Sequence, residues 1–337
     1  MFMEMLSTVH GEDPVFLEVV EEVSKLALLE RPCLVVGERG TGKELLTSRL
    51  HYLSRRWEGP LVKVNCAALS ESLLESELFG HEAGAFTGAH GRHVGRFERA
   101  DGGTLVLDEI ATASAAVQEN VLRIIEYGEF ERVGGSDTIE VDVRVVGSTN
   151  VDLPALARAG KFRADLLDRL AFAVLTVPPL RARPADVLAL AHQFGLEMTR
   201  ALEREVFPGF TARAETELLS HDWPGNVREL KNVVQRAVWR ATELEEPISA
   251  FQLDPFESPW RPTTAEASAA TTNTSSDECE SVSDFDTGFE QQVARFECTL
   301  LRTALQDARS NQTRAARTLD LSYHQFRRLI AKHRLRQ

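Results

Sequence analysis

Two short segments of this 337-residue sequence carry groups suited to phosphate chemistry. The first, GERGTGKE, follows the apolar run Cys33–Val36 and precedes a helical pattern, and its glycines leave backbone N–H groups exposed to a ligand. Such a loop, the Walker A pattern, cradles phosphates at the positive end of the next helix, and its lysine reaches the terminal ones. A purely structural turn is the alternative. The residues predicted to surround the phosphates are Gly37, Glu38, Arg39, Gly40, Thr41, Gly42, Lys43 and Glu44.

The second segment, GGTLVLDEI, is an apolar strand that ends in Asp108 and Glu109. The generic loop ends in Ser or Thr, whose hydroxyl binds Mg²⁺, but Glu44 stands at that position here, so Mg²⁺ must depend on another carboxylate or on water. Asp108 is predicted to hold Mg²⁺, and Glu109 to orient and deprotonate the attacking water in phosphoryl transfer. The alternative is that the pair merely caps a helix.

Further polar groups follow other predicted elements. Thr149 and Asn150 end the strand VVGSTN, and ligands gather at the carboxyl ends of strands in open α/β sheets, so these side chains are predicted to sense the terminal phosphate. Arg163 and Arg169 in KFRADLLDRLAF, and Arg228 in WPGNVREL, offer planar cations that suit phosphate oxygens. The alternatives are a polar turn for the first pair and surface salt bridges for the arginines.

These groups need a scaffold, and the pattern of the chain predicts one. Between residues 14 and 177, helical patterns alternate with short apolar runs rich in β-branched residues, which indicates βαβ units and a three-layer α/β domain with a parallel sheet. Residues 185–250 are predicted to be helical, and the Ser/Thr/Asp-rich stretch that follows is predicted to be a flexible acidic linker. The predicted strands are Cys33–Val36, Leu61–Val64, Thr104–Leu107, Val143–Val146 and Ala173–Val177.

The composition is that of an ordinary globular protein, but its charge is unevenly distributed. The net charge is −13, whereas residues 291–337 contain ten Lys/Arg against three Asp/Glu, which predicts that only this tail meets nucleic acid. No stretch approaches the ~20 apolar residues of a membrane span, and the N-terminus lacks the pattern of a signal peptide. A cytoplasmic protein without membrane insertion is expected. The four cysteines lie far apart, so neither a zinc site nor a disulfide framework is expected.

The tail NQTRAARTLDLSYHQFRRLIAKHRL predicts two short helices separated by a turn, with a longer amphipathic helix before them. This is a helix-turn-helix pattern, whose second helix enters the major groove of DNA. Residues of the second helix are expected to lie near bases or phosphates, and cationic side chains such as Arg314 and Lys332 are expected to touch phosphates. A small dimerisation bundle with a basic face is the alternative. The residues predicted to bind DNA are Arg314, Ser322, Tyr323, His324, Gln325, Arg327, Arg328 and Lys332.

The segment GAFTGA carries an aromatic ring, Phe86, beside Thr87 within six uncharged residues that are too glycine-rich for a core element. Together with ESELFGHEAGAFTGA, GGTLVLDE, FRADLLDRL and WPGNVRELKN, it resembles the bacterial enhancer-binding proteins, AAA+ ATPases that activate RNA polymerase carrying sigma-54. The resemblance implies an AAA+ three-layer α/β domain with an α-helical lid and a C-terminal, all-α, Fis-type helix-turn-helix. It implies that the loop contacts sigma-54 through Gly84, Ala85, Phe86, Thr87, Gly88 and Ala89.

The same resemblance implies further roles. Asn65 matches the residue that restrains Glu109, Arg163 and Arg169 match arginine fingers that reach into a neighbouring subunit, and Arg228 matches the lid arginine that contacts nucleotide. Fingers supplied in trans imply a ring, typically a hexamer in this family. The cofactors implied are ATP and Mg²⁺, and the partners are sigma-54 RNA polymerase and upstream enhancer DNA.

The expected domains are an AAA+ α/β subdomain at 1–180, a lid at 181–257, a linker at 258–288 and the helix-turn-helix domain at 289–337. About ten residues precede the ATPase region, so no separate sensory domain is expected. This architecture resembles the phage-shock branch of the family, which implies a negative regulator of the phage-shock protein A type, with Trp57 as a candidate contact. The alternatives are an AAA+ remodelling enzyme of another class and a DNA-binding regulator with a non-productive ATPase.

Overall fold

The fold is described from a computed structural model of the chain. The model describes residues 11–86, 88–89, 91–241, 246–258, 260–261, 297–305, 308, 312–319 and 321–333. The chain divides into two compact units, Met1–Glu257 and Ser258–Gln337, and each is described by itself. Most of the predicted linker, and Thr87 of the GAFTGA segment, lie outside the described residues.

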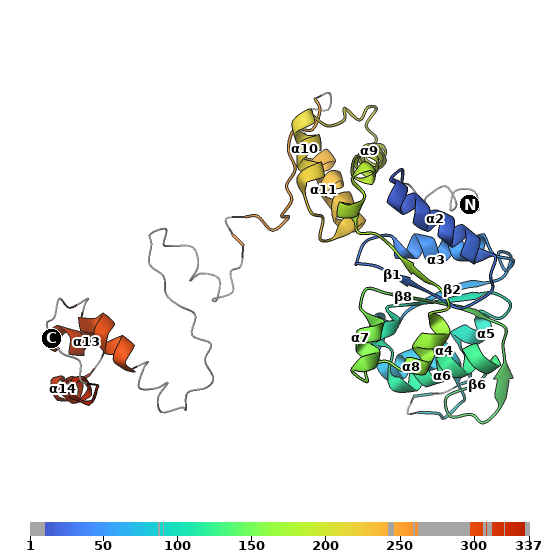
Figure 1. The fold of residues 1–337 in the computed structure, drawn as a ribbon, viewed down its shortest axis with the longest axis horizontal. Coiled ribbons are helices and arrows are strands. Elements are labelled where there is room, and N and C mark those ends of the chain that lie inside the picture. Colours follow the sequence, from blue (N-terminus) through green and yellow to red (C-terminus); the bar gives the residue numbers. More distant parts are fainter. Residues whose placement is uncertain are drawn as a thin grey trace. The chain divides into compact units, whose positions relative to one another are not determined.

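A five-stranded parallel sheet forms the centre of the first unit, in the order β2-β5-β8-β1-β9 (Figure 1). Each strand coincides with one of the five apolar runs predicted from the sequence, so that prediction is confirmed. All six residues of β8 are buried, including the polar Arg144, Ser148 and Thr149, as expected of a central strand covered on both faces. The strands are β1 Cys33–Val36, β2 Leu61–Asn65, β5 Thr104–Asp108, β8 Arg144–Thr149 and β9 Val174–Thr176.

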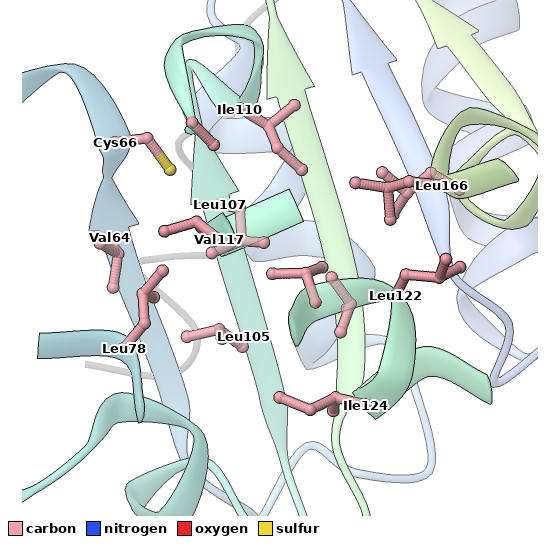
Figure 2. Close-up of a cluster of buried hydrophobic side chains, with 14 of the residues drawn as sticks. Val64, Cys66, Leu78, Leu105, Leu107, Ile110, Val117, Leu122, Ile124 and Leu166 are labelled. Carbon is pink, nitrogen blue, oxygen red and sulfur yellow. The ribbon is translucent and has the colours of Figure 1, made fainter. Parts of the chain in front are cut away.

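Helices cover both faces of this sheet. Successive side chains along a strand point to opposite faces, and both faces carry apolar side chains that must be buried. Cys33, Val35 and Val106 belong to the core on one face, together with residues of α2 (Pro14–Ala27) and α3 (Lys43–Tyr52). Leu34, Leu105 and Leu107 belong to the core on the opposite face, part of which Figure 2 shows. The helices on that face are α4 (Glu71–Phe79), α5 (Arg96–Arg99), α6 (Ala115–Tyr127), α7 (Leu153–Arg158) and α8 (Ala164–Leu170). The predicted three-layer domain is confirmed.

Two small antiparallel hairpins, which the sequence did not predict, extend this domain. One pairs β3 (Gly80–His81) with β4 (His93–Val94), and the other pairs β6 (Glu129–Glu131) with β7 (Thr138–Glu140). Backbone hydrogen bonds join the two hairpins, from Val133 N to Gly80 O at 3.1 Å and from Glu82 N to Val133 O at 3.1 Å. The GAFTGA segment lies inside the first hairpin. Short 3₁₀ turns follow at η1 (Cys66–Ala68), η2 (Ile110–Thr112) and η3 (Leu180–Ala182).

The helical part of the first unit comprises α9 (Pro184–Ala201), α10 (Ala212–Ser220) and α11 (Asn226–Arg240), as the sequence predicted. Its core is built around Trp223, which is fully buried and whose indole Nε1 donates a hydrogen bond to Leu218 O at 2.9 Å. Residues of α9 and α11 pack into the same core, so Trp223 fixes the short segment between α10 and α11 against both helices.

In the second unit, residues 297–305 are helical, followed by α13 (Gln312–Thr318) and α14 (Tyr323–Lys332). These elements share one small apolar core that includes Leu301, Ala315, Ala316 and Phe326. The two predicted helices of the tail and the helix before them are thereby confirmed. Among the helices of the described residues, no candidate for a membrane span was found.

Candidate functional site

The loop predicted to bind phosphate runs from the end of β1 to the start of α3, in the strand–loop–helix context that the sequence predicted. Gly40 and Gly42 have φ angles of +78° and +101°, a left-handed conformation that favours glycine. Gly40 is also constrained by space, because a Cβ atom there would lie 2.3 Å from Gly225 O. Inside the loop, Thr41 Oγ1 donates to Glu38 O at 2.9 Å. The loop is thus held in a compact turn at the N-terminus of a ten-residue helix.

Lys43 is buried at the first position of α3, and its ammonium folds back over the loop. The Nζ atom donates to Gly37 O at 2.8 Å and to Glu38 O at 3.1 Å. Burial lowers the pKa of Lys43, and the nearby carboxylates of Glu109 and Asp108 oppose that effect. The lysine and the acidic pair therefore act on one another electrostatically, as one site requires.

Asp108 and its neighbours stand at the carboxyl ends of adjacent strands. The register pairs Asn65 with Asp108 across β2 and β5, and Val36 with Thr149 across β1 and β8. Ser148 Oγ donates a hydrogen bond to Asp108 Oδ1, so one carboxylate oxygen is oriented by the neighbouring strand. The sheet thereby brings predicted site residues from four strands to one edge.

Backbone geometry marks Glu109 as unusual. Its φ of +51° places a non-glycine residue in the left-handed region, where it precedes η2. Such conformations cost of order 1–3 kcal/mol and are concentrated at active sites. The sequence gives no signal for this strain. On the adjacent strand, Asn65 Oδ1 accepts a hydrogen bond from Ala67 N at 2.9 Å and so caps η1.

The other strand-end residues lie where predicted. Thr149 is fully buried, its carbonyl accepts from Gly37 N at 3.2 Å, and its Oγ1 accepts from Val151 N at 3.2 Å. Asn150 follows it and is half-buried. Glu44, by contrast, points its carboxylate outward, where it pairs with Lys63 Nζ at 2.9 Å and has a side chain 79% exposed. The residue that replaces the generic hydroxyl thus has a basic partner on β2.

The lid approaches the loop through the start of α11. Val227 N donates to Gly40 O at 3.0 Å, and a Cβ atom on Gly40 would lie 3.2 Å from the Cβ atom of Arg228. The charges of Arg228 and Arg39 each help to lower the pKa of Lys43. The structure therefore brings Arg228 beside the loop.

An apolar cavity of about 310 Å³ opens beside Thr41 and Gly42. Its walls come from α2, α3, α9 and α11, segments far apart in the sequence, so no local pattern could have revealed it. Arg183 closes one side by donating from Nη2 to Thr41 O at 2.8 Å and by lying over the Phe16 ring at 4.6 Å. Its apolar lining residues are Phe16, Leu45, Leu190, Phe194 and Val227.

Arg163 and Arg169 are not brought to the loop of their own chain by the contacts that the structure describes. Arg163 immediately precedes α8 rather than lying within it, and pairs with Asp165 at 2.8 Å and Glu119 at 3.3 Å. Arg169 lies on α8, is 60% exposed, and pairs through Nε with Glu126 Oε1 at 2.7 Å. Both guanidinium groups lie at the surface of the α6–α8 side of the domain.

The described residues of the GAFTGA segment, Gly84–Phe86 with Gly88 and Ala89, lie between the two strands of the first hairpin. Gly84 and Gly88 have φ angles of +85° and +104°, and Gly84 N donates to Ala89 O at 2.9 Å. The Phe86 ring is 46% exposed and packs edge-on against the His81 ring at 4.9 Å between centroids. Between the flanks of this segment, the nearly buried Arg132 pairs with Glu82 at 2.9 Å and Glu98 at 2.5 Å.

The predicted DNA-binding side chains all lie exposed in the second unit. Phe326 is buried between them on α14, so its neighbours project outward from the same helix. Ser322 Oγ caps the helix by accepting from Gln325 N at 3.3 Å, and it donates to Gln325 Oε1 at 2.8 Å. Lys332 pairs with Glu297 at 2.9 Å. Gln325 and Lys332 are thus partly engaged within the module, and the Arg327 guanidinium lies over the Tyr323 ring at 5.9 Å from its centroid.

Comparison with known proteins settles the family. A Sigma-54 interaction domain matches residues 9–176, an AAA+ ATPase lid domain matches 181–269, and the Fis family of bacterial regulatory proteins matches 292–333. The chain is 54% identical over 325 residues to the Psp operon transcriptional activator of Escherichia coli (strain K12). The match covers 96% of this chain and 97% of that protein. This chain belongs to the sigma-54-dependent transcriptional activators.

Other relatives support the same assignment for this activator. It is 48% identical over 225 residues to the regulatory protein AtoC of Escherichia coli (strain K12), covering 67% of this chain and 49% of AtoC. The solved structure of NtrX from Brucella abortus in complex with ATP matches with a TM-score of 0.67 at 28% identity, over 96% of this chain and 69% of that one. The activator is an ATP-binding AAA+ ATPase that interacts with sigma-54 and binds DNA through a Fis-type module, and it couples hydrolysis to remodelling of the promoter complex.

Proposed function

We propose that the activator hydrolyses ATP at the edge of the sheet formed by β1, β5 and β8. The observation that carries this proposal is the position of Lys43: its ammonium is held over the loop, within electrostatic reach of Asp108 and Glu109. Lys43 would bind the terminal phosphates, and Glu109 would take the proton of the attacking water. Thr149 and Asn150 would sense the terminal phosphate from the next strand.

The test is open-complex formation at a sigma-54 promoter with purified chain and ATP. Lys43→Ala is expected to abolish both hydrolysis and open complexes. The matched control is Lys25→Ala, because Lys25 has a side chain 72% exposed on α2 and pairs only with Glu21 among the ion pairs described. Equal open-complex formation by Lys43→Ala and the unmodified chain would show the proposal to be wrong.

Magnesium would be held at Asp108, one carboxylate oxygen of which accepts a hydrogen bond from Ser148. Oxygen ligands fit Mg²⁺, which keeps several waters in phosphate sites. The metal would supply charge neutralisation for the phosphates. Glu44 is paired with Lys63, so it is not proposed as a ligand. Asp108→Asn is expected to weaken Mg²⁺-dependent ATP binding while leaving metal-free binding nearly unchanged.

The nucleobase would occupy the cavity of about 310 Å³ beside Thr41 and Gly42. The flat faces of a heteroaromatic ring bind in concave sites lined by aliphatic and aromatic side chains, which Phe16, Phe194 and Val227 supply here. Leu190→Trp would fill this cavity, and it is expected to weaken binding of ATP but not of inorganic triphosphate.

Arg163 and Arg169 would act on the nucleotide of a neighbouring subunit, because both are exposed and their described contacts lie away from the loop of their own chain. A ring, proposed to be a hexamer, follows from this arrangement. Mixing inactive Arg169→Ala subunits with inactive Glu109→Gln subunits is expected to restore part of the hydrolysis, since some sites then receive both groups. Absence of recovery in mixtures shown to be co-assembled would contradict supply in trans.

The turn Gly84–Ala89 would contact sigma-54 through Phe86 and Thr87. Thr87→Ala is expected to leave hydrolysis largely intact while abolishing sigma-54 binding. A hydrolysis defect of equal size would assign the turn to the nucleotide site instead. The exposure of Phe86 supports the proposal, because an apolar side chain is presented between the two strands of the hairpin.

The helix α14 would enter the major groove of upstream DNA, with Arg327 and Arg328 near bases or phosphates. The likeness to the Psp operon activator supports a phage-shock operon as the target and a negative regulator of the phage-shock protein A type. Trp57, which is 47% exposed, is the proposed contact for that regulator. Trp57→Ala should reduce capture of phage-shock protein A, whereas Trp260→Ala, at an 88% exposed tryptophan, should not.

A further inference from the structure

Asn226, the first residue of α11, is completely buried at the contact between the lid and the phosphate-binding loop. Its φ of +52° lies in the left-handed region, which asparagine tolerates better than most residues. A buried amide without partners would be costly, so its surroundings must satisfy both its donors and its acceptor.

The side chain meets that requirement with three hydrogen bonds. Its Nδ2 donates to Glu38 Oε2 at 3.1 Å and to Arg39 O at 3.0 Å, and its Oδ1 accepts from Leu180 N at 2.8 Å. One amide thus joins the loop, the η3 turn and the start of α11. A carboxylate at this position could still accept from Leu180 N but could donate to neither loop oxygen.

Neighbouring contacts fix the same junction. Val227 N donates to Gly40 O at 3.0 Å, and Gly40 packs so closely on Gly225 O that no side chain fits. Outside this layer, Arg181 forms two bonds with the Glu38 carboxylate, at 2.9 Å and 2.5 Å. Hydrogen bonds from Arg181, the larger cause, and from Asn226 lower the pKa of Glu38 to about 2. The carboxylate that accepts the hydrogen bond from Asn226 is therefore ionised at neutral pH.

Arg228 follows Asn226 by two residues, within the first turn of α11. The direction in which Arg228 leaves the helix is therefore set by how that turn is fixed to the loop. We propose that Asn226 is a positioning residue for ATP binding: it locks the first turn of α11 onto Glu38 and Arg39 and thereby aims Arg228 at the phosphates. This inference rests on the proposed ATP site and on the nucleotide contact of Arg228 that the family resemblance implies.

A double-mutant cycle on the full chain tests it, with a fluorescent ATP analogue and Mg²⁺ and the dissociation constant as readout. Asn226→Asp keeps the size of the side chain but sets two carboxylates against each other, and is expected to weaken binding about tenfold, equal to ~1.4 kcal/mol. Arg228→Ala should weaken binding by a similar or larger factor. The double variant should bind no more weakly than Arg228→Ala alone, because Asn226 acts through Arg228.

Three comparisons make the outcome decisive. Asn232→Ala, at an exposed asparagine of the same helix, should bind within about twofold of the unmodified chain. Adding Glu38→Gln to Asn226→Asp removes the repulsion and should recover part of the affinity. Thermal melting of the nucleotide-free chains checks folding, and a role limited to folding would lower the melting temperature without the coupling.

The inference is overturned if Asn226→Asp binds ATP like the unmodified chain, or if its effect multiplies with that of Arg228→Ala. Normal binding by Arg228→Ala would refute the assignment of Arg228 to the nucleotide, and this inference with it. In that case a loss of binding in Lys43→Ala would still uphold the ATP site itself, so the two failures can be told apart.

Discussion

Replacement of Phe86 by alanine tests whether the hairpin tip is a binding surface or a structural part of the ATPase. The residue is 46% exposed. An aromatic residue can bury about 200 Å², so roughly 90 Å² remain for a partner to cover. At about 25 cal/mol per Å², that area is worth at most ~2.3 kcal/mol, or about a fiftyfold change in affinity. The expected result is a loss of sigma-54 binding approaching that factor, with ATP hydrolysis changed less than about twofold.

The assay compares sigma-54 binding by the full chain, in the presence of ADP and aluminium fluoride, with its steady-state ATP hydrolysis. Phe256→Ala is the matched control, because Phe256 is 69% exposed and lies at the end of the first unit, outside the hairpins. Phe86 also packs on His81. Phe86→Leu keeps an apolar group there, so its sigma-54 binding should fall between that of Phe86→Ala and that of the unmodified chain. A drop in hydrolysis as large as the loss of binding would refute the reasoning.

Further outcomes are expected at three other residues. Glu109→Gln should retain ATP binding but lower the turnover number by at least about a hundredfold, as measured in a phosphate-release assay. Trp223→Ala removes the fully buried indole of the lid core and should cost about 3–5 kcal/mol of unfolding free energy, seen in urea titrations. The pKa of Glu38 is lowered from 4.5 to about 2, so its ion pair stabilises the fold above pH 4.5 and that contribution fades as the pH falls toward 2. Because Glu38 is partly exposed, Glu38→Gln should cost less than ~1 kcal/mol at pH 7, and the difference from the unmodified chain should shrink between pH 5 and 3.

The strands and the phosphate-binding loop could be predicted because their signals are local. An apolar run such as that of β5, followed by Asp108, specifies a strand and its functional end within a few residues. The helix-turn-helix was predictable for the same reason, since Phe326 and the alanines of α13 follow a helical period.

Features that depend on distant partners could not be predicted in this way. The two hairpins have strands of only two or three residues, and they are fixed by hydrogen bonds such as that from Val133 N to Gly80 O. The apolar cavity is lined by residues that are far apart in the sequence, such as Phe16 and Phe194. The sequence does not mark Asn226, because its role depends on three hydrogen bonds to Glu38, Arg39 and Leu180.

The buried guanidinium of Arg132 gives the GAFTGA hairpin a mechanical property. Its two carboxylate partners, Glu82 and Glu98, stand on opposite sides of the turn along the chain, so one cation closes the stem from which the tip projects. Because these ion pairs close the base of the hairpin, the hairpin would transmit force instead of stretching. Arg132 itself lies in the segment directly after β6. Load applied at Phe86 would therefore pass into two anchored hairpins at once, rather than along a single strand of backbone.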